Sequence, residues 1–293
     1  MIGGVNMLRD KFSIVPNAQA VLDICKNGRY NVNGRIIDIS CAIDRMKNNT
    51  DFVSDKKVYP SFNLYNRMDN ISKMTVELSK EKTVDAILRL KGTENLGVLN
   101  FASARNPGGG WLTGAKAQEE SLCLCSALYA SLMTEEAQQY YTENFKHTLP
   151  DYTDNMVYSP KVPFFKDGDY KNVEYVLADV LTCPAINRGA ILKRVDMRKG
   201  IKESDLDMKN RMFKILLEFK ERGCKTLILG AFGCGVFDND PDVVAKNWVE
   251  LINLEVFENS FDKIVFAVFD RPPKMACYSA FARQMGGKVT ILK

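Results

Sequence analysis

The feature that most constrains the fold is an alternation of short apolar runs and amphipathic helical segments that starts near residue 75. Strand-like runs are predicted at residues 75–78, 98–101, 174–181, 225–229 and 263–269, with a last one at 288–292. Helices are predicted at 79–91, from Gln118 onwards, at 206–222, after Asp240 and at 275–285. This alternation predicts a mostly parallel sheet covered by helices on both faces, with ligands bound beyond the carboxyl ends of the strands.

Residues 1–60 are expected to form an accessory segment. Helical spacing predicts a helix at 17–26 with Asn17 as a candidate N-cap, and Asn33-Gly34 between two short strand-like runs is a strong hairpin signal. Residues 44–57 are polar and are predicted to be a loop. So short a stretch buries little core alone. We therefore expect it to pack on a core formed by residues 61–293, giving a single structural domain overall.

The amino-acid composition limits the kinds of catalytic site that the chain is expected to have. The only histidine is His147, in a polar stretch that favours a surface role, so a His-rich zinc site and a histidine-dependent nucleophile are disfavoured. The eight cysteines include no CxxC pair and are expected to be reduced thiols. The net charge is only +4, without a dense basic block. Carboxylates are therefore the expected catalysts, and no metal or cofactor is expected.

Location and assembly can also be predicted. No apolar run approaches the length of a membrane span, and the N-terminal stretch lacks the charged and apolar regions of a signal peptide. We therefore expect a cytoplasmic protein that does not bind membranes. A monomer is expected.

Residues 100–129 concentrate the candidate chemistry. A buried strand leads into Pro107 and three consecutive glycines, Gly108, Gly109 and Gly110. Gln118-Glu119-Glu120 follows on the first turn of a helix predicted to bury Leu122, Cys125, Tyr129 and Leu132. A strand, a glycine loop and a helix can present backbone N–H groups to an anion, although a flexible turn is the alternative.

A second glycine loop follows the strand at 225–229. Its glycines, Gly230, Gly233 and Gly235, have the spacing GxxGxG, which is neither a P-loop nor a dinucleotide-binding fingerprint. It is either an ordinary strand-to-helix turn or a diphosphate loop. If both glycine loops lie at the same edge of the sheet, they could hold one ligand between them.

The adjacent glutamates cannot act as an ordinary glycosidase pair. Successive helical residues point about 100° apart, so Glu119 and Glu120 cannot flank one bond. One would transfer the proton and the other would position the substrate, unless both simply complement the helix dipole. A helix N-terminus lowers a glutamate pKa, whereas burial raises it as a general acid requires. The sequence does not decide whether the helix N-terminus or burial has the larger effect on the glutamate pKa.

The spacing of three glycines, seven residues and Gln-Glu-Glu resembles the signature of bacterial-type poly(ADP-ribose) glycohydrolases, which are macrodomain enzymes. Residues 17–40, 152–165 and 181–190 resemble other segments of that family, so the likeness covers roughly residues 17–285. It implies a three-layer α/β/α macrodomain with a mixed, mostly parallel central sheet and an N-terminal helix and hairpin. It also implies hydrolysis of the ribose–ribose O-glycosidic bonds of poly(ADP-ribose) from chain ends, releasing ADP-ribose.

The resemblance assigns roles to residues. Glu120 would be the acid and Glu119 would bind the ribose hydroxyl beside the scissile bond. Gly233, Cys234, Gly235 and Val236 would present their backbone N–H groups to the diphosphate. Phe237 would pack on the terminal sugar or base. Glu77 would stand in the place of the aspartate that accepts a hydrogen bond from the adenine amino group. The alternative is that Glu77 is an exposed charge at the end of a strand. The implied substrate-binding residues are Glu77, Asn100, Ser103, Asn106 (the preferred polar contact to the distal ribose), Pro107, Gly108, Gly109, Gly110, Gln118, Gly230, Gly233, Cys234, Gly235, Val236 and Phe237.

Two other functions stay open. The chain could be a mono(ADP-ribosyl) hydrolase that acts on protein or nucleic acid, or a non-catalytic ADP-ribose-binding module. The Gln-Glu-Glu motif argues against the second, because a pure binder needs no buried acid. The expected partner is therefore poly(ADP-ribose) or an ADP-ribosylated macromolecule.

Overall fold

The computed structural model describes residues 14–68, 74–193, 201–270, 275–286 and 290–291. Within these residues, one sheet has eight strands in the order β10-β4-β9-β8-β5-β7-β6-β3. Its strands are β3 (Asp51–Val53), β4 (Thr75–Ser79), β5 (Leu96–Phe101), β6 (Met156–Lys166), β7 (Asn172–Cys183), β8 (Thr226–Leu229), β9 (Lys263–Ala267) and β10 (Thr290–Ile291). The strand predicted at 288–292 is thus described only at its centre.

The sheet is mixed and mostly parallel, as predicted. The strands from β10 to β7 pair in parallel, whereas β6 and β3 are antiparallel to their neighbours. Strand β6 runs through Pro160. Its register with β7 shifts between Ser159 and Val162. A bulge there accommodates a proline that has no N–H to donate.

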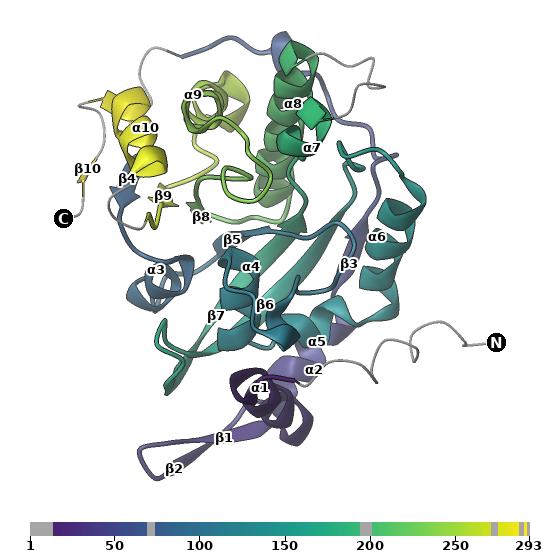
Figure 1. Ribbon diagram of the computed structural model, residues 1–293. Helices are drawn as coiled ribbons and strands as arrows, with labels where there is room; N and C mark the ends of the chain where they lie inside the picture. The colour runs from purple at the N-terminus through teal and green to yellow at the C-terminus, as the bar shows by residue number, and fades with distance from the viewer. Residues whose placement is uncertain (1–13, 69–73, 194–200, 271–274, 287–289, 292–293) are drawn as a thin grey trace.

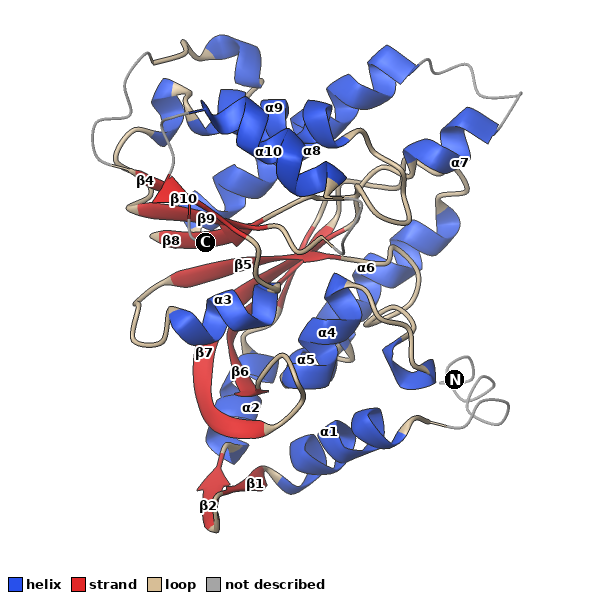
Figure 2. Ribbon diagram, turned by 60° about the vertical axis from the view of Figure 1, so that its left-hand side comes forward, coloured by secondary structure: helices blue, strands red, loops and turns tan. Residues whose placement is uncertain are grey.

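Helices cover both faces of the sheet (Figure 2). On one face lie α8 (Ile201–Glu221), α9 (Pro241–Ile252) and α10 (Ala276–Met285), and on the other α3 (Thr83–Arg89), α4 (Gln118–Cys125), α5 (Leu128–Leu132) and α6 (Glu135–Lys146). Short α7 (Arg188–Lys193) packs on α8. Successive strand residues alternate between the faces. In β8, Leu227 and Leu229 accordingly join one apolar core and Ile228 the other. The predicted three-layer α/β/α architecture is confirmed.

The N-terminal segment forms α1 (Pro16–Asn27), a hairpin of β1 (Arg29–Val32) and β2 (Arg35–Asp38), and α2 (Ser40–Asn48) (Figure 1). Asn33 and Gly34 have φ of 49° and 87°, as a tight hairpin turn requires. The loop predicted at 44–57 is wrong: α2 continues to Asn48 and β3 joins the main sheet. Buried Ile43 and Met46 hold this mostly polar helix on the core.

Several helix boundaries differ from the predictions. Helix α8 starts at Ile201, five residues before the predicted start at Leu206. Val15, with Pro16 after it, is the N-cap of α1 in place of Asn17. Ser79 ends β4, so α3 starts four residues later. The single helix predicted after Gln118 is split at Ser126, which is extended (φ −148°, ψ 178°) and bridges to the sheet at Phe164. No helix among the described residues is long and apolar enough to cross a membrane.

Candidate active site

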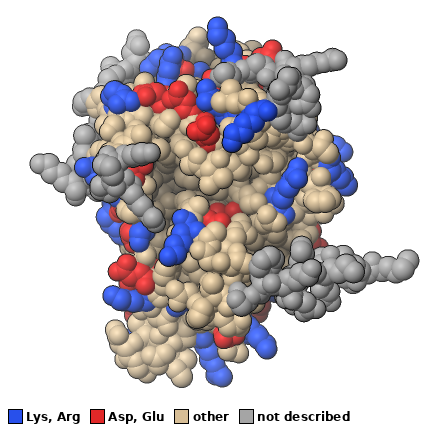
Figure 3. Space-filling view, in the orientation of Figure 1, with Lys and Arg blue, Asp and Glu red and all other residues tan. Residues whose placement is uncertain are grey.

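A cavity of about 730 Å³ opens at the carboxyl ends of β5, β8 and β9. Both glycine loops and the start of α4 line it, because these segments directly follow parallel strands or lie against their ends. Figure 3 shows the hollow in the middle of one face, with acidic and basic side chains around its mouth. The structure therefore brings together the two segments that the sequence had singled out separately.

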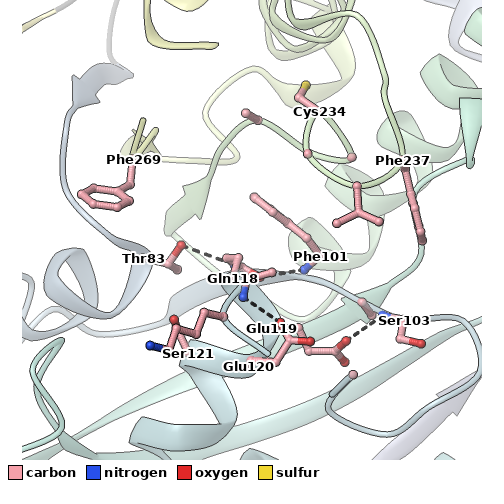
Figure 4. A pocket seen from close by; sticks show the side chains of 18 of the residues that line it. Thr83, Phe101, Ser103, Gln118, Glu119, Glu120, Ser121, Cys234, Phe237 and Phe269 are labelled. Atoms are coloured by element: carbon pink, nitrogen blue, oxygen red, sulfur yellow. Dashed lines mark hydrogen bonds between the residues drawn. The ribbon is translucent and has the colours of Figure 1, made fainter. Parts of the chain in front are cut away.

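Most of the predicted site residues line this cavity. They are Ser103, Asn106, Gly109, Gly110, Gln118, Glu119, Glu120, Gly233, Cys234, Gly235, Val236 and Phe237. Glu77, Asn100, Pro107, Gly108 and Gly230 do not line it. Cys234 and Phe237 lie across the cavity from Glu119 and Glu120 (Figure 4).

Glu119 is buried against the end of β5. Its Oε2 accepts a hydrogen bond from the Ser103 N–H at 2.7 Å, and its Oε1 accepts one from Asn100 Nδ2 at 3.4 Å. Burial raises the pKa of Glu119 to about 8, and the nearby charge of Glu120 adds to this, while the two hydrogen bonds oppose it. This raised pKa favours the protonated form of Glu119 at pH 7.

Glu120 is also buried, but it is held by backbone donors. Its Oε1 accepts a hydrogen bond from the Gly110 N–H at 2.9 Å, and its Oε2 accepts one from the Ala117 N–H at 3.0 Å. The carboxylate thus caps its own helix and ties it to the glycine loop. These two donors fix one orientation for the side chain at the cavity wall.

The first glycine loop is shaped around the two carboxylates. Gly108 and Gly109 have φ of 71° and 62°, in the region that favours glycine. A Cβ at Gly109 would collide with the Glu120 carboxylate and lie 3.1 Å from Glu119 Oε2. A Cβ at Gly108 would lie 2.7 Å from the Trp111 ring. The loop is therefore closely packed, which contradicts the alternative of a merely flexible turn.

Gln118 positions the acidic helix. Its Oε1 accepts a hydrogen bond from the Phe101 N–H at 2.9 Å, and its Nε2 donates to the Leu99 carbonyl at 2.8 Å and to Thr83 Oγ1 at 3.4 Å (Figure 4). The amide therefore joins α4 to the end of β5 and to α3. Although Gln118 borders the cavity, its polar groups are turned to the protein.

The second glycine loop leaves several N–H groups open. The N–H of Cys234 donates to the Ala231 carbonyl at 3.1 Å, so it is already used within the turn. In the part of the chain that the structure describes, no protein acceptor binds the N–H groups of Gly233, Gly235 and Val236. Three of the four N–H groups expected to meet a diphosphate are thus available.

Glu77, predicted to bind the adenine, does not line the cavity. Its carboxylate is buried within β4, where it pairs with Arg89 and, at 3.3 Å, with Lys263 Nζ. Leu78 and Ser79 extend the strand past it, so it lies short of the edge where the cavity opens. It is therefore neither a cavity residue nor the exposed strand-end charge considered as its alternative.

Asn100 and Gly230 do not line the cavity, but their hydrogen bonds hold parts of its wall in place. The buried Asn100 amide donates to Glu119 and, at 3.1 Å, to Thr182 Oγ1, so it orients a carboxylate instead of reaching the cavity. The Gly230 carbonyl accepts a hydrogen bond from Trp248 Nε1 at 3.1 Å, which anchors the second loop on α9. Pro107 and Gly108 lie behind the cavity wall.

Some residues that line the cavity were not predicted from the sequence. Phe269 and Asp270 follow β9, and the Phe269 side chain is 50% exposed. The rule that ligands bind beyond strand ends could have found both. Tyr152, whose ring lies 5.8 Å from Phe237, comes from an irregular segment and carried no such signal.

Metal independence stays a prediction. Among the residues that the structure describes, no group of three or more His, Cys, Asp or Glu side chains could hold a metal ion. All eight cysteines are free, and Cys123 and Cys125 are buried in the core as expected.

Comparisons with known proteins found a matching family model and similar solved structures. The family model for the catalytic domain of microbial-type PARG matches residues 18–167, just over half of the chain. A search of curated proteins found no match. A poly(ADP-ribose) glycohydrolase from Thermomonospora curvata, solved with the inhibitor ADP-HPD, is 35% identical with a TM-score of 0.80. That similarity covers 92% of this chain and 97% of the relative.

A second relative comes from another organism. The poly(ADP-ribose) glycohydrolase of Deinococcus radiodurans, solved in complex with ADP-ribose, is 33% identical with a TM-score of 0.75. The similarity covers 87% of this chain and 98% of the relative. On the matched family model and on identities of this size over nearly the whole length, the chain belongs to the microbial-type poly(ADP-ribose) glycohydrolase family.

Proposed function

We propose that this chain hydrolyses the ribose–ribose O-glycosidic bond of poly(ADP-ribose) and releases ADP-ribose from chain ends. One observation carries the proposal: two buried carboxylates and a loop with open N–H groups face each other across one cavity. Membership of the glycohydrolase family supports it. The relative solved in complex with ADP-ribose shows which ligand such a site accepts in that protein.

The cavity offers a partner for each part of a terminal ADP-ribose unit. The N–H groups of Gly233, Gly235 and Val236 suit the diphosphate, since backbone donors in a glycine loop bind anions. The half-exposed ring of Phe269 provides a face on which adenine can stack. Asn106, on the first loop, lies on the side of the carboxylates and suits the distal ribose.

The acid role is proposed for Glu120. It donates a proton to the leaving ribose oxygen as the C–O bond breaks and the distal ribose becomes oxocarbenium-like. The bound diphosphate stabilises that positive charge. Glu120, now ionised, accepts a proton from the water that attacks the sugar. The backbone donors on Glu120 keep it in place through both steps.

Glu119 is proposed to bind the ribose hydroxyl beside the scissile bond. Because its pKa is raised to about 8, it can donate a hydrogen bond at neutral pH. The same proton makes Glu119 the competing candidate for the acid. If Glu120 is the acid, Glu120→Gln should lose the hydrolysis step. If Glu119 is the acid, Glu119→Gln should lose it instead.

The test is release of free ADP-ribose from poly(ADP-ribose), with EDTA present, by the parent, Glu120→Gln and Glu119→Gln. We expect fast release by the parent and a loss of about 10³-fold or more in kcat for Glu120→Gln, with ADP-ribose binding retained. Calorimetry measures the binding. A larger loss of kcat in Glu119→Gln would move the acid role to Glu119.

Two results would replace the proposal. If the parent bound ADP-ribose and released none from the polymer, a mono-linked substrate or a non-catalytic binding role would be the better account. If EDTA abolished release, the metal-free mechanism would be wrong. The cytoplasmic location and the monomeric state stay predictions, which fractionation and light scattering can test.

A further inference from the structure

A tyrosine that the proposed reaction does not use lines the cavity in a strained backbone conformation. Tyr152 has φ of 55° and lies in the irregular segment before β6. A bulky side chain rarely adopts this left-handed region, so the surrounding structure must hold it there. Among the described residues other than glycine that have positive φ, only Tyr152 and Tyr170 line the cavity. Because strained residues are concentrated at active sites, Tyr152 is a candidate ligand contact.

The buried side chain of Arg211, on α8, holds the backbone at Tyr152. Its Nη2 donates to the carbonyls of Asp151 at 2.8 Å and of Tyr152 at 3.2 Å. Its Nη1 donates to the Pro184 carbonyl at 3.0 Å, and its Nε pairs with Asp154 at 2.7 Å. The planar guanidinium can bind these carbonyls and the carboxylate at once, which a lysine ammonium cannot. Arg211 is therefore placed to act as a positioning residue.

Helix α6 ties the segment that carries this tyrosine to the wall with the carboxylates. The buried Asn144 Oδ1 accepts hydrogen bonds from the Thr153 N–H and from the Thr153 hydroxyl, both at 3.0 Å. One turn earlier on α6, the Tyr140 hydroxyl donates to the Ser103 carbonyl at 3.1 Å. The Ser103 N–H in turn donates to Glu119. The segment is thus fixed relative to the acidic side of the cavity.

The Tyr152 ring lies at the end of the cavity away from Phe269. It contacts the Phe237 ring, with the two ring centroids 5.8 Å apart. Phe237 and Ser103 lie on one side of the site, and Phe269, the proposed face for adenine, lies on the other (Figure 4). In the part of the chain that the structure describes, no group hydrogen-bonds to the Tyr152 hydroxyl. This hydroxyl is therefore available to a ligand.

We propose that Tyr152 is a specificity-determining residue that binds the distal ribose of ADP-ribose, and that Arg211 positions it. The inference rests on the proposed function, because it names a contact to the same ligand. With adenine on Phe269 and the diphosphate on the second glycine loop, the distal ribose reaches the end of the cavity that holds Tyr152. A ribose hydroxyl can donate to the phenolic oxygen or accept a hydrogen bond from it.

The test measures two affinities by calorimetry: that for ADP-ribose and that for ADP, which lacks the distal ribose. The first variant is Tyr152→Phe, which keeps the ring and removes only the hydroxyl. We expect its ADP-ribose affinity to fall about 5-fold, as the loss of one hydrogen bond implies, and its ADP affinity to stay within about 2-fold. Tyr152→Gly, which adopts positive φ without strain, should lose more ADP-ribose affinity because the ring is also removed.

Tyr170→Phe is the matched control in the same cavity. Tyr170 has φ of 67°, but its turn lies on the side of Phe269. Lys82 Nζ donates to the Gly168 carbonyl in that turn at 2.9 Å and lies 5.8 Å from the centre of the Phe269 ring. This variant should therefore keep the parental ratio of ADP-ribose affinity to ADP affinity.

Arg211→Lys tests the positioning role. This variant keeps the positive charge but loses the planar set of donors, so the ratio of ADP-ribose affinity to ADP affinity should fall as it does in Tyr152→Phe. An arginine that only stabilised the fold would lower both affinities together or neither.

The inference is overturned if Tyr152→Phe weakens ADP and ADP-ribose equally, or if it changes neither affinity. A parental ratio in Arg211→Lys would remove the positioning role. A parent that binds ADP-ribose but releases none from the polymer would refute only the proposed function, because the ratio of affinities still tests Tyr152.

Discussion

The two glycine loops differ in what they present to the cavity. In the loop at Gly108–Gly110, positive φ angles and nearby carboxylates leave no room for a side chain. In the loop at Gly230–Gly235, a Cβ at Gly235 would meet nothing within 4 Å, and the useful groups are the free N–H donors. The first loop packs closely around the two carboxylates that are proposed to catalyse the reaction. The second loop has unpaired N–H groups that are proposed to bind the ligand.

Among the glycine substitutions, the largest effect is expected from Gly109→Ala. The added methyl would collide with Glu120 and strain a φ of 62°, so both carboxylates must shift. Displacing a catalytic group by about 1 Å can cost about 10²-fold in rate. We expect at least that loss in kcat/KM, measured by ADP-ribose release. A variant with parental kcat/KM would show that the first loop does not shape the catalytic site.

A smaller and different effect is expected from Gly233→Ala. Its φ is 74°, and a Cβ there would contact Ala185 and Asn239, so the loop must rearrange. Because this loop is proposed to bind the diphosphate and holds no acid, the loss should fall on KM and ADP-ribose affinity, by about 10-fold, with little change in kcat. Equal losses in kcat and kcat/KM would contradict the division of labour between the loops.

Gly235→Ala is the matched control within the second loop. Its φ is not positive, and open space surrounds the added methyl. The N–H group is kept by alanine. We expect ADP-ribose affinity, measured by calorimetry, to stay within about 2-fold of the parent, because substitutions away from contacts cost little. A large loss would mean that the ligand approaches the backbone at Gly235 too closely for any side chain.

Glu119, on α4 beside the first loop, should also set a pH dependence of stability. Glu119 has a pKa of about 8 in the folded protein against 4.5 ordinarily, so between these values the folded state binds a proton that the unfolded state does not. Stability therefore falls as pH rises through this window, by at most about 1.4 kcal/mol per pH unit. Below pH 4.5 both states are protonated and the effect is absent.

Glu119→Gln should remove this slope. The variant should gain stability relative to the parent as pH rises from 5 toward 8, which urea unfolding at several pH values can measure. Exposed Glu94→Gln is the control and should keep the parental pH dependence. A constant stability difference between parent and Glu119→Gln across this range would show that the carboxyl does not titrate in it.

Much of the site could be predicted because it follows from local order in the chain. A glycine loop that directly follows a buried parallel strand must lie at the carboxyl edge of the sheet. Both loops therefore had to meet if their strands neighboured each other, and β5 and β8 do pair. Tyr152 could not be found this way, because no strand leads into the irregular segment that carries it.

The sequence by itself determined the layered α/β/α architecture, the hairpin at Asn33-Gly34 and the position of Glu119 and Glu120 at a helix start. These features depend on periodicity and turn chemistry, which are properties of neighbouring residues. Only the tertiary structure decided that the Glu77 carboxylate pairs with Arg89 and Lys263 and that burial raises the pKa of Glu119. The physical reason is that burial and charge pairing depend on atoms supplied from distant parts of the chain.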